Sequence, residues 1–226
     1  MNLLDQPLGE LARDIPGATR IFNEHGLDFC CGGHVSLRAA ASIKDFDPEV
    51  IALRLQQAIA AATPADRDWN AATPAELVEH IVSRYHDTHR EQLPELVRLA
   101  HRVETVHGEK PECPRGLGEL LERIQAEMES HMHKEEQILF PMLASEHGAM
   151  ATGPIAVMRR EHDQHGGNLA QMAVLTNDIS LPAEACNTWS ALYLGLRTLR
   201  EDLMEHIHLE NNILFAKAAA ATPAHS

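Results

Sequence analysis

Residues 131–140 read HMHKEEQILF and residues 206–215 read HIHLENNILF, so the pattern H-x-H-x-E-x-x-I-L-F occurs twice. A second motif also recurs, because HDTHREQL at 86–93 matches HDQHGGNL at 162–169 as H-D-x-H-x-x-x-L. The copies lie 75 and 76 residues apart and follow the same order in each half. The chain therefore contains an internal repeat, in which each half carries the same pair of motifs.

The spacing within the first motif predicts a helix with two polar side chains on one face. Residues four apart on an α-helix lie on the same face, with Cβ atoms about 5–6 Å apart. His131 and Glu135 have this spacing, and the second copy of the motif repeats it. The second motif adds one histidine per half from another helix. The candidate metal ligands are His86, His131, Glu135, His162, His206 and Glu210.

Four imidazoles and two carboxylates form a donor set that suits a pair of iron ions. Carboxylates can bridge two metals, and imidazoles complete the coordination while positions stay open for small ligands. A single inward histidine in a bundle is more often a hydrogen-bonded core residue, and one His-x3-Glu pair is often a surface ion pair. The recurrence of the whole arrangement favours the metal site over these readings.

Four further histidines also repeat. His133 and His208 lie two positions after a ligand, about 200° around the helix, so we expect them to face outward or to bind the backbone. His89 and His165 lie three positions after a ligand, close to the same face. They are either additional ligands or residues that support the ligands, and we favour support.

Three acidic residues lie near the ligands in the sequence. Glu127 and Asp202 each precede a ligand histidine by four residues, and Glu161 directly precedes His162. These carboxylates either orient imidazoles or line a channel to the site. Ordinary solvated carboxylates remain an alternative.

Capping signals and breaks in the pattern predict four long helices. Thr73-Pro74-Ala75-Glu76 is a capping box with proline at the first helical position. Pro94 is expected to bend the first helix, and Pro141 to kink or end the second. Short connections predict an antiparallel up-down bundle. The expected helices cover about 73–106, 117–146, 154–176 and 182–219.

The fold class is therefore all-α, with a four-helix up-down bundle at residues 74–220 preceded by a small helical domain. Residues 1–60 form this N-terminal domain, and a helix is expected from Asp47-Pro48. Residues 61–73 are expected to be a linker.

Composition limits the functional classes. Lys and Arg number 19 against 33 for Asp and Glu, which gives a formal net charge of −14. A chain this acidic, without a basic patch, is not expected to bind nucleic acid. Apolar runs are too short to span a bilayer, and the first ten residues lack signal-peptide features. We therefore expect a cytoplasmic protein without membrane contact.

The sequence resembles the repair of iron centres family of YtfE/ScdA-type proteins over essentially its whole length. In that family a small N-terminal domain precedes a hemerythrin-like bundle, and four His and two bridging Glu hold the di-iron site. Those ligands fall on the six residues selected by the repeat. The motifs that carry the resemblance are DQPLGELA near the start, DFCCGG at 28–33, RYHDTHREQLPEL at 84–96, SHMHKEEQILFPM at 130–142, REHDQHG at 160–166 and DLMEHIHLENNILF at 202–215.

The resemblance implies a stress-response protein that repairs iron–sulfur clusters damaged by nitrosative or oxidative stress. Two non-haem iron ions with an oxo or hydroxo bridge would serve as iron donor or redox centre. A non-enzymatic repair role is favoured. Nitric oxide binding or reduction and oxygen or redox sensing are the alternatives. Damaged iron–sulfur proteins and a diatomic ligand, nitric oxide or oxygen, are the expected partners, and a homodimer stays open.

The vicinal Cys30 and Cys31 match the family's N-terminal motif and are the candidate catalytic thiols. The glycines that follow them are expected to leave the thiols accessible, and a thiolate is both a nucleophile and a soft metal ligand. Iron handover, a redox role and contact with a client protein are the possible functions, and simple core packing is the alternative. Cys113, in a Pro-rich loop, and Cys186 are expected to have no function.

Overall fold

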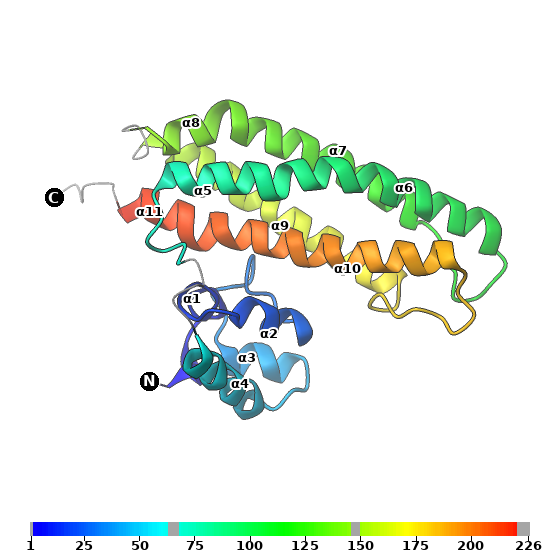
Figure 1. Ribbon diagram of the computed structural model, residues 1–226, viewed down its shortest axis with the longest axis horizontal. Helices are drawn as coiled ribbons and strands as arrows, with labels where there is room; N and C mark the ends of the chain where they lie inside the picture. The colour runs from blue at the N-terminus through cyan, green and yellow to red at the C-terminus, as the bar shows by residue number, and fades with distance from the viewer. Residues whose placement is uncertain (1, 63–67, 146–149, 221–226) are drawn as a thin grey trace. The chain divides into compact units, whose positions relative to one another are not determined.

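The computed structural model describes residues 2–62, 68–145 and 150–220, and this part of the chain is helical without β-strands (Figure 1). An isolated bridge joins Pro7 and Ser36. None of the described helices combines the length and the hydrophobicity that a bilayer-spanning segment needs. The chain forms two compact units. The first contains residues up to Glu79, Leu143–Thr152 and the residues from Met204 onward, and the second contains His80–Met142 and Gly153–Leu203.

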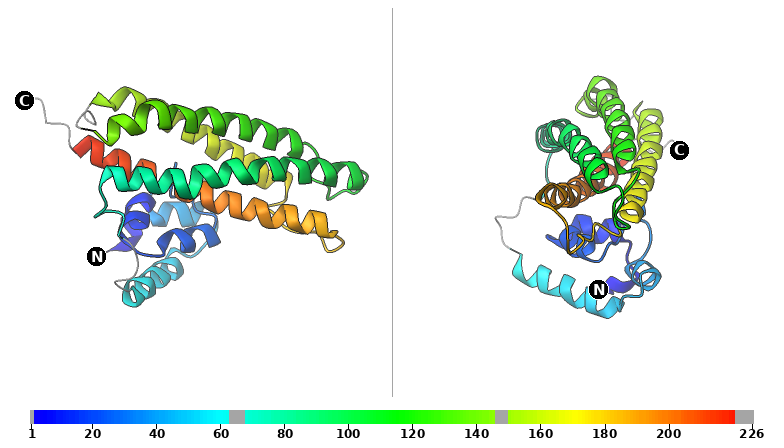
Figure 2. Two further views of the ribbon diagram at one scale, coloured as in Figure 1. Left: turned by 45° about the horizontal axis from the view of Figure 1, so that its top comes forward. Right: turned by 90° about the vertical axis from the view of Figure 1, so that its right-hand side faces the viewer.

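The second unit contains most of the four long helices, which run side by side in both views (Figures 1 and 2). Their inward faces bury leucines together with Trp189 and Tyr193. Gly195 lets two helices approach closely, because a Cβ there would lie 2.5 Å from Cδ2 of Leu96. The prediction of an all-α fold with a four-helix bundle after a small helical domain is confirmed. The bundle helices are α6 (Asp87–His107), α7 (Leu117–Lys134), α9 (Thr152–Leu175) and α10 (Asn187–His208).

Short helices and π-helical turns extend three of these helices. The turns η2 (Val82–His86), η3 (Glu135–Leu139) and η5 (Leu209–Leu214) form continuous helices with their neighbours. Pro94 lies inside α6 without ending it. Pro141, where a kink or an end of the second helix was expected, lies in the short helix α8 that follows α7 and η3. The flanking short helices are α5 (Pro74–Ile81), α8 (Phe140–Leu143) and α11 (Phe215–Ala220).

The predicted start of the first long helix is confirmed, whereas that of the fourth is wrong. The Thr73 hydroxyl accepts from the Glu76 amide at 3.3 Å, and the Glu76 carboxylate accepts from the Thr73 amide at 2.8 Å, which is a capping box. The fourth helix begins at Asn187 rather than near Pro182. Positive φ angles at residues 177–179 end α9, and a turn closed from Ala185 to Pro182 delays the next helix.

The first unit contains four short N-terminal helices after the turn η1 (Leu3–Asp5). Pro48 occupies the first position of its helix as expected, and the Asp47 side chain caps that helix. Phe22, Phe29 and Leu37 are fully buried in the core. Part of the predicted linker, residues 63–67, lies outside the described residues. So do residues 146–149, which cover the predicted end of the second helix and part of the turn after it. The N-terminal helices are α1 (Leu8–Asp14), α2 (Ala18–Glu24), α3 (Leu37–Ile43) and α4 (Pro48–Ala61).

Candidate metal centre

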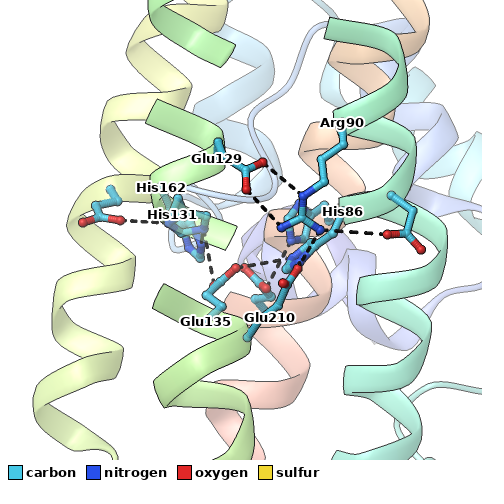
Figure 3. A network of polar contacts seen from close by, with 11 residues as sticks. His86, Arg90, Glu129, His131, Glu135, His162 and Glu210 are labelled. Carbon is cyan, nitrogen blue, oxygen red and sulfur yellow. Dashed lines mark hydrogen bonds and ion pairs between the residues drawn. The ribbon is translucent and has the colours of Figure 1, made fainter. Parts of the chain in front are cut away.

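Four of the six candidate ligands lie in the second unit and come from three helices. His86 is the last residue of η2, His131 belongs to α7, Glu135 opens η3 and His162 belongs to α9. All four are buried, with at most 1% of each residue exposed. Figure 3 shows their side chains turned toward one another.

The Glu135 carboxylate lies between two imidazoles. Its Oε2 is 3.4 Å from Nε2 of His86, and its Oε1 is 3.3 Å from Nε2 of His131. The Nε2 atoms of His131 and His162 are 3.2 Å apart. Adjacent ligand atoms around a metal with bonds of about 2.0–2.2 Å lie roughly 3 Å apart. These separations are therefore those expected of ligands that share a metal ion.

The remaining two ligands, His206 and Glu210, form the pair predicted from the repeat. Both are fully buried, and Nε2 of His206 lies 3.1 Å from Oε1 of Glu210. His206 is in α10 and Glu210 is in the π-helical turn η5. The predicted four-residue spacing thus brings the imidazole and the carboxylate together on one face of the helix.

The six residues fall into two groups that could each hold a metal ion. Within each group the ligand atoms all lie within 4.8 Å of one another. Glu135 and Glu210 belong to both groups. Buried carboxylates are costly unless a cation or hydrogen bonds compensate them, and histidine with carboxylate is a donor set that suits iron. The residues present therefore fit a di-iron site. The groups are His86, Glu135, His206 and Glu210, and His131, Glu135, His162 and Glu210.

A carboxylate orients the His131 ring. Nδ1 of His131 lies 2.9 Å from Oε2 of Glu161, and Lys134 binds the other oxygen of that carboxylate. The hydrogen bond with His131 is the main cause that lowers the pKa of Glu161 to about 2. When Nδ1 donates to this carboxylate, the Nε2 lone pair can bind a metal ion shared with Glu135, which is the usual arrangement of metal-binding histidines. This contact corresponds to the first of the roles considered for Glu161, in which the carboxylate orients an imidazole.

The sequence analysis missed Glu136, which plays the same part for His86. Its Oε1 lies 2.8 Å from Nδ1 of His86 and 2.9 Å from Nη1 of Arg90. Nε of Arg90 in turn donates to Glu129 at 3.0 Å (Figure 3). The repeat gave no signal for Glu136, because Asn211 occupies the equivalent position in the second copy. Its position one residue after a ligand carboxylate was the only available hint.

The other two acidic candidates bind side chains of neighbouring helices. Glu127 accepts from Gln164 at 2.8 Å and from Asn168 at 2.7 Å. Asp202 accepts from both Nη atoms of Arg84, at 3.3 and 2.5 Å. Asp202 is buried, so the alternative of an ordinary solvated carboxylate is wrong for this residue. Glu127 is half-buried and joins α7 to α9.

Of the four further repeated histidines, three are buried and one is exposed. His89 and His165 are buried, and neither belongs to the two ligand groups found among the described residues. His133 is exposed, as expected. The expectation for His208 is wrong, because this ring is buried and its Nδ1 accepts from the Asn212 amide at 2.8 Å. Burial lowers the pKa of His208 to about 4.

Three π-helical turns coincide with the ligand level of the bundle. His86 ends η2, Glu135 opens η3, and Glu210 is the second residue of η5. Such turns insert an extra residue into an α-helix and occur frequently at functional sites. Nothing in the periodicity of the sequence indicated them.

The vicinal cysteines differ in exposure. Cys30 is buried and Cys31 is half-buried, so the expected accessibility holds only for the second thiol. The glycines have another role, because a Cβ on Gly33 would lie 2.6 Å from the carbonyl oxygen of Phe29. The absence of a side chain therefore permits close backbone packing. The hydrogen bond with the neighbouring Cys31 thiol, together with burial, raises the pKa of Cys30 well above its usual value.

Comparison with known proteins gives two family matches and a set of close relatives. Residues 77–218 match the hemerythrin HHE cation binding domain, and residues 4–59 match ScdA_N, a domain of unknown function. The iron-sulfur cluster repair protein YtfE of Citrobacter koseri is 50% identical over 220 residues, which cover 97% of this chain and 99% of that protein. Proteins of the same name from Escherichia coli O17:K52:H18 and Shigella boydii serotype 4 are 51% and 50% identical over 216 residues, which cover 96% of this chain and 97% of each relative.

Proposed function

Because the chain belongs to the family of YtfE iron–sulfur cluster repair proteins, we propose that it repairs iron–sulfur clusters damaged by nitrosative or oxidative stress. The observation that carries the proposal is the buried set of four imidazoles and two carboxylates in the bundle. This set would hold two iron ions, which would supply redox chemistry and an iron source. Damaged iron–sulfur proteins are the substrates.

The two ligand groups suggest how the residues divide between the metals. Glu135 and Glu210 occur in both groups, so these two carboxylates would be shared between the ions. His86 and His206 would hold one ion, and His131 and His162 would hold the other. Each ion then has four protein ligands, fewer than the six of an octahedral site. The open positions suit an oxo or hydroxo bridge and a diatomic ligand such as nitric oxide or oxygen.

Glu136 and Glu161 position the site rather than bind the metals. Each carboxylate contacts the outer nitrogen of one ligand imidazole, and each side chain is 23% exposed. The basic partners Arg90 and Lys134 hold these carboxylates in turn. The reducing cytoplasm is the proposed location, because it keeps cysteine pairs such as Cys30 and Cys31 in the thiol form.

The first experiment measures metal content and the optical and EPR response to nitric oxide for the wild type and Glu135→Ala. About two irons per chain and a nitrosyl signal are expected, with both lost in the variant because removal of a bridging carboxylate leaves each ion short of a ligand. Glu129→Ala is the matched control, since this exposed glutamate lies on the same helix outside both groups. One iron or none, unaffected by Glu135→Ala, would overturn the metal assignment.

The second experiment tests repair directly. A client enzyme whose iron–sulfur cluster has been damaged by nitric oxide is incubated with the iron-loaded protein or with an equal amount of free ferrous iron. Recovery of client activity beyond that with free iron supports the proposal, and equal recovery contradicts it. Continuous consumption of nitric oxide with an added electron donor would instead support a reductase.

A further inference from the structure

Asp28, Cys30 and Cys31 form a compact group of ligand atoms in the first unit, apart from the six residues of the bundle. Their ligand atoms lie within 4.8 Å of one another. Sγ of Cys30 is 3.3 Å from Oδ1 of Asp28 and 3.6 Å from Sγ of Cys31. We infer that these three residues form a second metal site, which binds one borderline-soft divalent cation such as Fe²⁺ or Zn²⁺ through two thiolates and a carboxylate.

The separation of the two sulfur atoms fits a shared metal ion. Metal–thiolate bonds are about 2.3 Å long in tetrahedral sites, which places neighbouring sulfur ligands roughly 3.7 Å apart. The observed 3.6 Å between Cys30 and Cys31 is close to this value. A disulfide would need about 2.05 Å. Two thiolates also select borderline and soft cations over magnesium or calcium.

The backbone fixes the carboxylate beside the thiols. Oδ1 of Asp28 accepts from the amides of Cys30 at 3.2 Å and Cys31 at 2.9 Å. This turn orients the side chain before any ion arrives. Gly32 leaves room for it, because a Cβ at that position would lie 2.9 Å from Oδ2 of Asp28. The three ligands are therefore already arranged by the local chain.

The exposure of the three residues indicates a site that exchanges its ion. Asp28 is exposed and Cys31 is half-buried, whereas Cys30 is buried. Structural zinc sites usually have four protein ligands, and sites with three keep an open position. Water or a ligand from another protein can occupy that position. A cation at this site is therefore accessible to a partner.

Binding must displace the thiol protons. One divalent ion that enters the site takes the place of one proton from each of Cys30 and Cys31, and both protons pass to the buffer. Metal ions deprotonate coordinating thiols even when burial opposes the thiolate.

The amides of η5 hold this loop in place. The side chain of Asn211 donates to the Cys30 carbonyl at 3.2 Å, and that of Asn212 donates to the Phe29 carbonyl at 3.1 Å. The Phe29 ring packs edge-on against the His208 ring, with centroids 5.5 Å apart. The loop with the thiols is thus fixed to the turn that contains Glu210.

The test is an anaerobic titration of the full-length protein with Co²⁺. Cys113 and Cys186 are first replaced by serine, so that Cys30 and Cys31 are the remaining thiols. The bundle ligands contain no sulfur, so a thiolate-to-cobalt charge-transfer band reports on the proposed site alone. We expect this band together with proton release, which is measured by calorimetry in buffers of different ionisation enthalpy.

Three variants test the ligand assignment. Replacement of both Cys30 and Cys31 by serine is expected to abolish the band, and Cys31→Ser alone tests a half-buried position that tolerates the change more readily. Asp28→Asn keeps the amide-accepting oxygen but loses the charge, so we expect at least about tenfold weaker binding. Asp14→Asn, an exposed carboxylate of the same unit, is the matched control.

Absence of the charge-transfer band in the parent protein would overturn the inference, as would a band that survives in both cysteine variants. Circular dichroism verifies that each variant is folded. Iron in the bundle is measured separately on the same samples. Normal iron content without the charge-transfer band would contradict this site but leave the proposed function intact. A charge-transfer band without iron in the bundle would support this site but contradict the proposed function.

Discussion

Asn211 donates a hydrogen bond of 3.2 Å from its side-chain amide to the backbone carbonyl of Cys30. The equivalent position of the first repeat is Glu136, whose carboxylate contacts the imidazole of His86. One repeat position therefore orients a metal ligand in one half and holds the thiol-bearing loop in the other. The two repeats therefore share the residues that supply metal ligands and differ at the position that contacts neighbouring segments.

Replacement of Asn211 by alanine is expected to loosen the loop of Cys30 and Cys31. The buried carbonyl loses its donor, which costs about 1–3 kcal/mol. Urea unfolding should show this loss, and the rate at which Cys31 reacts with a disulfide reagent should rise severalfold. Gln137→Ala, at an exposed position of the first repeat, is the control. Unchanged stability and thiol reactivity would show that the amide does not hold the loop.

Glu136→Gln is expected to weaken iron retention about 10–100-fold, because ligand imidazoles depend on the groups that orient them. The amide oxygen can still accept from the His86 ring, but the charge that makes the imidazole a stronger ligand is gone. Competition with a chelator measures the effect. Glu129→Gln removes a neighbouring carboxylate that accepts from Arg90 at 3.0 Å and does not contact a ligand imidazole in the network of Figure 3, so it should retain iron like the wild type. Equal loss from both variants would indicate a general effect of charge.

Glu161→Gln tests the corresponding position beside His131. The change removes the charged acceptor of Nδ1 and a partner of Lys134, so we expect iron retention to fall by a similar factor of about 10–100. Glu127→Gln is a suitable control, since this carboxylate binds Gln164 and Asn168 instead of a ligand ring. If Glu161→Gln holds iron as tightly as wild type, the contact with His131 has no role in metal binding.

Gly33→Ala is expected to destabilise the first unit by about 1–3 kcal/mol through overpacking. A Cβ would lie 2.6 Å from the Phe29 carbonyl oxygen and 3.1 Å from Cα of Gly9, and neither backbone atom can move freely. Gly167→Ala is the control, because a Cβ there meets nothing within 4 Å and alanine favours the helix by about 0.5–1 kcal/mol. Thermal unfolding of both variants should therefore shift in opposite directions. A neutral Gly33→Ala would contradict the close packing.

Removal of iron is expected to lower the melting temperature. A ligand that binds only the folded state stabilises it by about 2.7 kcal/mol at one hundred times its dissociation constant. Differential scanning calorimetry of iron-loaded and chelator-treated protein measures the shift. Glu135→Ala should melt at the same temperature in both preparations, because it lacks a bridging ligand. A shift that persists in this variant would place the stabilising metal elsewhere.

The local parts of this structure were predictable from the sequence. Helical spacing placed His131 beside Glu135 and His206 beside Glu210, and the capping box at Thr73 fixed a helix start. These features depend on residues within one turn of each other, so periodicity and capping rules are sufficient.

Features that depend on contacts between distant segments were not predictable. The burial of His208 follows from its packing against Phe29, 179 residues away in the chain. Glu136 acquires its role only when the helix of His86 lies beside it. The segment that ends α9 has Asp178 and Ile179 in a left-handed conformation, and both contact arginines of the distant helix α10, Arg200 and Arg197. Single-sequence patterns carry no information about such pairings.

The π-helical turns divide each of three helices into two amphipathic segments that are out of phase. One extra residue shifts the angular position of everything beyond it by about 100°. The apolar stripe before η3 and the stripe after it therefore follow different registers, although the helix axis continues. Loss of a single residue from Glu135–Leu139 would restore regular helix but turn one buried stripe toward solvent. The bundle thus depends on the length of these turns as well as on the residues in them.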